Sequence, residues 1–299
     1  MFEYKPAICY SGYRHGQSPI TKVYPSDAEV LEDLRILSKH FSYIRMYDIS
    51  HHAESVLRVI TEHHVPLKVM LGVEPKGEIS NPNCPWGGVY SDEELAKHKT
   101  GNIIQLDQVA VLANRYKDIV LAVSIGNENT AHWHPNKMSA ATLVEHAKYL
   151  KSKTDLPITF CEGAHEWRNQ GAELAKIVDF ISIHVYPLWQ RIPYAEAVEV
   201  TIDEYQKTKA AFPDKPIIFT EFGWTTSATE QMDTTQTTEE NHKAYLDRMI
   251  AWSKQNQVTM FIFEAFDEPW KGGPDPLEAE KHWGIYNVDR SGKSWINQR

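Results

Sequence analysis

Two glutamates, each at the end of an apolar run, are the residues best suited to carry chemistry in this chain. Glu128 follows the run 119–126 in the segment SIGNEN, and Glu221 lies in TEFGWTT near the end of the run 216–223. Glycoside hydrolysis needs a protonated carboxylic acid that donates to the leaving oxygen. It also needs an ionised carboxylate that attacks the sugar or activates water. Two glutamates on facing strand ends would supply this pair.

Further carboxylates and tryptophans lie at the ends of other apolar runs. They are Asp48, Glu74, Glu162, Glu264, Asp267 and Glu268, together with Trp86, Trp133, Trp167, Trp189, Trp224 and Trp270. Sugar C–H faces stack on aromatic rings, while carboxylates accept hydrogen bonds from sugar hydroxyls. This combination on one rim indicates a carbohydrate site. We expect Trp133, Trp189 and Trp224 to contact the sugar.

These side chains need a scaffold that brings many strand ends to one face. Eight short apolar runs alternate with longer segments of helical periodicity, which is typical of repeated β-then-α units. The runs cover residues 5–13, 43–49, 67–73, 119–126, 157–163, 180–186, 216–223 and 259–266. We therefore expect an α/β protein in which residues 1–299 form a single (β/α)8 TIM barrel, with the active site at the C-terminal face of the strands. An open doubly wound sheet is less well supported, because no GxGxxG motif follows the first run.

The composition restricts the classes of partner. The 299 residues include 31 Lys and Arg against 40 Asp and Glu, which gives a net charge of −9. Nucleic acids and anionic membranes need clustered positive charge, so we expect neither as a partner. The sequence has no run of 18 apolar residues and no export-signal pattern at its N-terminus, so we expect no membrane span and no signal peptide in it. Cys9, Cys84 and Cys161 are far apart and are expected to be free thiols.

The many histidines raise the question of a metal site. The 14 histidines include the pairs His51–His52 and His63–His64 and the segment 132–134, which reads HWH. No HExxH motif is present, and adjacent histidines on a helix or strand do not face one ion well. We expect neither a catalytic metal nor a cofactor.

Six segments, in this order, resemble glycoside hydrolase family 17, which belongs to clan A of the retaining β-glycosidases. They are IRMYD (44–48), VSIGNE (123–128), SIHVYP (182–187), TEFGW (220–224), FEAFDEPWK (263–271) and HWGIYNVD (282–289). The segment FEAFDEPWK is more similar to bacterial and fungal members than to plant members. The inserted loop that carries Trp86 has no counterpart that the resemblance assigns.

The resemblance implies a retaining double displacement on β-1,3-glucan. Glu128 corresponds to the acid/base, Glu221 to the nucleophile, and Asn127 to the residue that bonds the 2-hydroxyl of the sugar being cleaved. Other matching positions are expected to line the site or to bind sugar hydroxyls, and they are Tyr47, Tyr186, Glu268, Lys271 and Glu280. In a retaining enzyme the two carboxyl groups lie roughly 5 to 5.5 Å apart, so the ionised nucleophile favours the protonated form of its partner.

The sequence alone is compatible with three functions. The first is hydrolysis of laminarin-like β-1,3-glucan, and the second is transglycosylation with the same two glutamates. The third is a glucan-binding barrel without chemistry, against which the presence of both glutamates and Asn127 argues. We expect a monomer whose partner is a β-1,3-glucan oligosaccharide or polysaccharide. This substrate class favours the periplasm or the cell exterior as the location.

Overall fold

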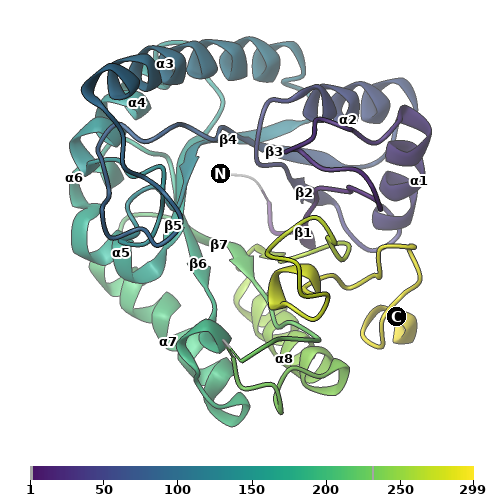
Figure 1. Ribbon diagram of the computed structural model, residues 1–299. Coiled ribbons are helices and arrows are strands. Elements are labelled where there is room, and N and C mark those ends of the chain that lie inside the picture. The colour runs from purple at the N-terminus through teal and green to yellow at the C-terminus, as the bar shows by residue number, and fades with distance from the viewer. Residues whose placement is uncertain (1–2, 231) are drawn as a thin grey trace.

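Eight parallel strands close into a barrel in the computed structural model, which describes residues 3–230 and 232–299 (Figure 1). The strands are β1 (Ala7–Cys9), β2 (Tyr43–Arg45), β3 (Lys68–Gly72), β4 (Val120–Asn127), β5 (Ile158–Gly163), β6 (Ile181–Val185), β7 (Ile217–Phe222) and β8 (Met260–Ile262). They pair in chain order, and β8 closes the barrel by pairing with β1. The predicted (β/α)8 fold is confirmed, and every strand overlaps its predicted run.

Helices form a ring outside the strands, as Figure 1 shows. They are α1 (Asp27–Leu37), α2 (His51–Glu62), α3 (Asp92–Arg115), α4 (Ala140–Lys151), α5 (Ala164–Gln170), α6 (Ala172–Ala175), α7 (Tyr194–Ala211) and α8 (Glu239–Asn256). Short 3₁₀ helices are η1 (Pro187–Gln190), η2 (Ala279–Lys281) and η3 (Ile296–Gln298). None of the helices in the described ranges combines the length and the apolar character that crossing a membrane requires.

Helix α1 illustrates how the sequence sets an element's start and its buried face. Ser26 accepts a hydrogen bond from the backbone of Glu29, and the Glu29 carboxylate accepts one from the Ser26 backbone N–H at 2.7 Å. This capping box satisfies two N–H groups that have no partner inside the helix. Val30, Leu34 and Leu37 recur at helical spacing and are fully buried.

The strands are mostly apolar because a parallel barrel is covered on its outer face and filled on its inner face. Ile8, Ile44 and Val69 lie at matching positions of the first three strands and are fully buried. The three cysteines are also buried, and all are free thiols as predicted. The predicted first and eighth runs extend beyond β1 and β8, because the chain there leaves the sheet to form the loops above the barrel.

A buried ion pair fixes the C-terminal segment against α1. Arg290 donates to both carboxylate oxygens of Asp33, through Nε at 2.7 Å and Nη2 at 2.6 Å. Replacing the fully buried Asp33 with alanine leaves the guanidinium without its partner. We expect this change to lower the free energy of unfolding by about 3–5 kcal/mol, measured by urea denaturation. The exposed Glu32 pairs with Arg14, so Glu32→Ala is the control and should cost less than about 1 kcal/mol. Equal denaturation midpoints for the two variants would contradict this expectation.

Candidate active site

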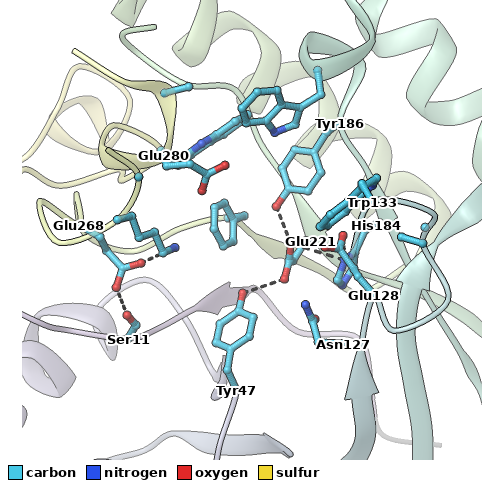
Figure 2. Close-up of a pocket in the computed structure, with 18 of the residues that line it drawn as sticks. Ser11, Tyr47, Asn127, Glu128, Trp133, His184, Tyr186, Glu221, Glu268 and Glu280 are labelled. Atoms are coloured by element: carbon cyan, nitrogen blue, oxygen red, sulfur yellow. Dashed lines mark hydrogen bonds and ion pairs between the residues drawn. The ribbon is translucent and has the colours of Figure 1, made fainter. Parts of the chain in front are cut away.

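A cavity of about 1170 Å³ lies above the C-terminal ends of the strands. Most of the residues predicted to form the site line it together, and Figure 2 shows several of them facing one another. These are Tyr47, Asn127, Glu128, Trp133, Tyr186, Trp189, Glu221, Glu268, Lys271 and Glu280. The fold therefore brings strand ends that are far apart in the sequence to one concave surface.

A tight turn at the end of β4 presents Glu128 to the cavity. The Asn129 side chain accepts from the Asn127 backbone N–H at 2.9 Å and donates to the Asn136 carbonyl at 2.9 Å. A Cβ atom at Gly126 would lie 2.3 Å from Asn129 Oδ1, so a larger residue here would displace the side chain that holds the turn. Glu128 itself has a φ of 55°, in the left-handed region that residues other than glycine rarely adopt. Such strained backbone is concentrated at functional positions.

Glu221, on β7, is held by hydrogen bonds from three side chains at the ends of β2 and β6. Tyr47 donates to Oε1 at 3.0 Å and Tyr186 donates to Oε2 at 2.7 Å (Figure 2). Arg45 Nη1 lies 2.5 Å from Oε1. Burial raises the pKa of Glu221. The positive charges of His184 and Arg45, with the hydrogen bonds from Tyr186 and Arg45, outweigh burial and hold this pKa below its ordinary value. The carboxylate is therefore ionised at neutral pH.

His184, on β6, lies between the two glutamates. Its Nδ1 is 2.9 Å from Glu128 Oε1 and 3.6 Å from Glu221 Oε2. One carboxylate oxygen of each glutamate and a ring nitrogen of His184 all lie within 4.8 Å of one another. The two carboxylates are thus close enough to act on a single glycosidic bond.

The charge of His184 is set by opposing contacts. Burial lowers its pKa, but the charge of Glu221 and the bonds to Cys161 and Glu128 raise the pKa to about 10. Arg45 Nη1 lies 3.3 Å from His184 Nε2, and because a guanidinium can only donate, this contact favours an unprotonated Nε2. The contacts with Glu221, Cys161 and Glu128 therefore favour a protonated His184, whereas the contact with Arg45 opposes a proton on Nε2.

Arg45, whose role was not predicted from the sequence, also orients Asn127. Its Nη2 lies 2.5 Å from Asn127 Oδ1. Since the guanidinium only donates, the amide oxygen faces Arg45 and the amide NH₂ is left to donate to another acceptor. Arg45 is 2% exposed and is the last residue of β2, inside the predicted apolar run 43–49. A charge inside an apolar strand needs a buried counter-charge, which is the signal that would have identified it.

A second charged cluster surrounds Lys271, and its member Glu268 lies on the far side of Glu221 from Glu128 in Figure 2. Lys271 Nζ contacts Glu268 and lies 3.2 Å from Glu264 Oε2. Burial lowers the pKa of Lys271, but the charges of Glu264, Glu268 and Glu280 outweigh burial and raise the pKa above its ordinary value. Lys271 therefore stays charged, and Glu268 and Glu280 lie with it on the cavity wall.

Glu162, at the end of β5, supports the turn that carries Glu128. It accepts hydrogen bonds from the backbone N–H of Thr130 at 2.9 Å and from the Thr130 hydroxyl at 2.7 Å. Burial, followed by the nearby charge of Glu128, raises the pKa of Glu162 to about 8. Its position at a strand end was noted from the sequence, whereas its support of this turn became visible only in the structure.

The tryptophans of the rim divide between the cavity and the core. Trp86, Trp133, Trp189 and Trp270 line the cavity. Trp283 lines it as well, although it comes from a segment where no strand end was predicted. Its ring centroid lies 6.4 Å from that of Trp189, so the two form one aromatic wall.

The structure corrects the prediction that Trp224 contacts the sugar. Trp224 is fully buried, its Nε1 donates to the Gln236 carbonyl at 2.8 Å, and its ring lies 5.4 Å from that of Tyr245. The preceding Gly223 explains this position, because a Cβ atom there would lie 2.3 Å from the Phe263 carbonyl oxygen. The close approach of the chain to Phe263 directs the next side chain into the core.

The group formed by Glu128, His184 and Glu221 is compact enough to hold a cation. However, the Arg45 guanidinium is already 2.5 Å from Glu221 and would repel one. Within the described part of the chain, the histidine pairs noted in the sequence form no such group. The site is therefore arranged for proton and carboxylate chemistry.

An eight-stranded parallel barrel with facing glutamates in an aromatic-lined cavity at its strand ends has the architecture of a glycoside hydrolase. The chain belongs to the BtgE/BtgC glycoside hydrolase domain family, whose model matches residues 7–284.

Two curated relatives are fungal proteins. A probable glucan endo-1,3-beta-glucosidase of Aspergillus clavatus is 26% identical over 306 residues, which cover 94% of this chain and 41% of that protein. A glucan 1,3-beta-glucosidase of Arthroderma benhamiae is 24% identical over 286 residues, which cover 89% of this chain and 83% of that protein. The chain thus spans about two fifths of the length of the Aspergillus relative.

Solved structures share the fold. An endo-laminarinase from Formosa superposes with a TM-score of 0.82 at 22% identity, covering 97% of this chain and 85% of that one. An active-site mutant of a Rhizomucor miehei beta-1,3-glucanosyltransferase, in complex with laminaritriose, gives a TM-score of 0.76 at 18% identity, covering 97% and 96%. At these identities the likeness establishes the barrel, and the chemistry has to be argued from the site.

Proposed function

We propose that this chain is a member of glycoside hydrolase family 17 that hydrolyses β-1,3-glucan with retention of configuration, in one catalytic domain. The observation that carries the proposal is the approach of a Glu128 oxygen and a Glu221 oxygen to within 4.8 Å. Retaining glycosidases place their carboxyl groups about 5 to 5.5 Å apart, whereas inverting ones leave about 6.5 to 9.5 Å for a water. The names of the fungal relatives support β-1,3-glucan as the substrate.

In the first step, Glu221 attacks the anomeric carbon while Glu128 donates its proton to the glycosidic oxygen, and the glycosidic bond breaks. Tyr47, Tyr186 and Arg45 keep Glu221 ionised and aimed at the sugar. A glycosyl ester on Glu221 and a chain with a free hydroxyl are the products of this step.

In the second step, Glu128 takes a proton from water, and the resulting hydroxyl replaces Glu221 at the anomeric carbon. The negative charge passes from Glu221 to Glu128 in the first step and returns in the second. His184 lies within 3.6 Å of an oxygen of each, so it contacts the charged carboxylate in both halves of the reaction.

Incubation with linear β-1,3-gluco-oligosaccharides tests this proposal, with the lengths of all products followed over time. Shorter products whose first-formed anomer is β support retaining hydrolysis. Products longer than the substrate would replace hydrolysis with transfer to a sugar hydroxyl. An α anomer formed first would contradict the roles of the two glutamates, and binding without turnover would make the chain a glucan-binding barrel.

The pH dependence of activity tests the role of Arg45. Its charge lowers the pKa of Glu221, so Arg45→Met should raise that pKa. Glu221 acts when ionised, so the acidic limb of the kcat/KM profile is expected to move to higher pH. We also expect kcat/KM at the optimum to fall by about 10²-fold, because Asn127 and Glu221 lose the group that positions them.

Arg45→Lys is the matched control for this experiment. It keeps the positive charge but loses the forked contact with Asn127 and Glu221, so its acidic limb should stay closer to that of the unmutated chain. If the acidic limb of the kcat/KM profile does not move in a folded Arg45→Met variant, Arg45 does not control the ionisation of Glu221.

A further inference from the structure

The loop between β3 and α3, residues 73–91, brings an exposed tryptophan to the cavity. Trp86 is 66% exposed, yet it is one of the residues that line the cavity. A single exposed aromatic residue is common on a protein surface. One that borders a substrate-sized cavity and pairs with a second tryptophan calls for a specific explanation.

Trp86 forms an aromatic pair with Trp133. The two ring centroids are 6.3 Å apart and the ring planes are inclined by 49°. Trp133 lies in the loop that follows Glu128, so the pair joins the inserted loop to the strand end that carries the candidate acid. Two inclined aromatic faces offer C–H-stacking surfaces to one sugar ring.

The inserted loop is fixed to the segment that carries Trp133. The buried Asn81 donates through Nδ2 to the carbonyls of His132 at 2.7 Å and His134 at 3.0 Å. Its backbone N–H also donates to the Gly88 carbonyl at 2.6 Å, which closes the loop on itself. Gly88 has a φ of 85°, and a Cβ atom there would lie 3.0 Å from the Pro135 carbonyl oxygen.

Both ends of the same loop are tied to the following part of the β4–α4 connection. The Glu78 N–H donates to the Lys137 carbonyl at 3.1 Å, and the Gly77 N–H donates to Asn136 Oδ1 at 3.3 Å. The Tyr90 hydroxyl, near the other end of the loop, also donates to Asn136 Oδ1 at 3.3 Å. Trp86 is therefore carried by a loop braced against the wall of the cavity.

The pair lies on one defined side of the catalytic glutamates. In Figure 2, Trp133 lies on the same side of Glu221 as Glu128 and His184, and Glu268 and Glu280 lie on the other side. In a double displacement the acid donates to the oxygen that links the sugar over the nucleophile to the departing sugar. The departing part of the chain therefore extends past Glu128, toward Trp133.

We infer that Trp86 and Trp133 form a sugar subsite on the leaving-group side of Glu128, which binds a glucose unit of the departing β-1,3-glucan chain. The inference rests on the proposed function, because it uses Glu128 as the acid. Trp133, in the loop that follows Glu128, supplies one stacking surface of the subsite. Trp86, in the inserted loop, supplies the other. The subsite favours substrates long enough to reach the inserted loop.

Binding of laminarihexaose to a Glu221→Gln chain, measured by titration calorimetry, tests the contribution of Trp86. Adding Trp86→Ala should weaken the affinity by about tenfold, as expected for loss of one stacking face. Trp86→Phe keeps an aromatic face and should recover most of the affinity. Val111→Ala changes an exposed apolar residue on α3 outside the cavity and should leave the affinity within twofold.

The cleavage position in the otherwise unmutated chain shows on which side the subsite lies. With laminarihexaose labelled at its reducing end, Trp86→Ala should move cleavage toward that end, so that shorter labelled fragments are released. An affinity within twofold and the same fragment pattern would overturn the inference while leaving the proposed function intact. Movement of cleavage toward the other end would also overturn it. If the unmutated chain neither binds nor cleaves laminarihexaose, the proposed function fails and the subsite fails with it.

Discussion

Replacement of Glu221 with alanine is expected to lower kcat on β-1,3-gluco-oligosaccharides by about 10⁴-fold or more. The carboxylate forms the covalent bond to the sugar in the proposed reaction, and no neighbouring group can take its place. Tyr47 and Tyr186 donate hydrogen bonds to this carboxylate, and Arg45 forms an ion pair with it. The substitution therefore also removes the partner of these three side chains. The rate of product release from laminarihexaose measures the loss.

Added azide distinguishes loss of the nucleophile from general damage to the site. In Glu221→Ala the small anion enters the space left by the side chain and attacks the anomeric carbon directly, so an α-glycosyl azide is the expected product. Circular dichroism should show a folded barrel. More than one hundredth of the original kcat in a folded variant would contradict the role of Glu221 as nucleophile.

Replacement of Glu128 with alanine is expected to lower kcat on the same oligosaccharides by about 10²- to 10⁴-fold, the range for loss of a general acid. The loss should depend on the leaving group, because a sugar alkoxide needs a proton and a dinitrophenolate does not. For a dinitrophenyl β-laminarioside, formation of the glycosyl ester should therefore be slowed much less than for an oligosaccharide. Stopped-flow release of dinitrophenol measures that step directly.

Azide again supplies the control for Glu128→Ala. Here Glu221 is still present to form the ester, and azide replaces water in the second step, so a β-glycosyl azide is expected. An equal loss on the two substrates, or an α-glycosyl azide, would assign a different role to Glu128. The opposite configurations expected from the two variants separate the acid/base from the nucleophile.

The barrel could be predicted because its strands are buried on both faces. Continuous apolar runs separated by segments of helical period have few other solutions in a chain of this length. The capping residues Ser26 and Glu29 act locally, so the start of α1 is set by residues that are close together in the sequence. The exact ends of the strands could not be predicted from the sequence, because hydrogen bonding to the neighbouring strands decides where each strand ends.

The cavity-lining positions of Glu128 and Glu221 followed from their places at strand ends and from the family resemblance. The roles of Arg45 and His184 did not, because they depend on contacts between separate strands: Arg45 on β2 and His184 on β6 both approach Glu221 on β7. The burial of Trp224 depends likewise on a close contact of Gly223 with Phe263. Side-chain direction beyond a strand end is a property of tertiary packing.

Trapping of the glycosyl ester tests the role of Glu221 most directly. A 2-deoxy-2-fluoro-β-laminaribiosyl fluoride forms the ester readily and hydrolyses slowly, since the fluorine disfavours the positively charged transition state of both steps while the good leaving group speeds the first. Mass spectrometry of the digested protein is expected to show one added disaccharide on the peptide that contains Glu221. Complete turnover of the reagent to the inverted sugar without a labelled peptide, or a label on Glu128, would contradict a retaining reaction through Glu221.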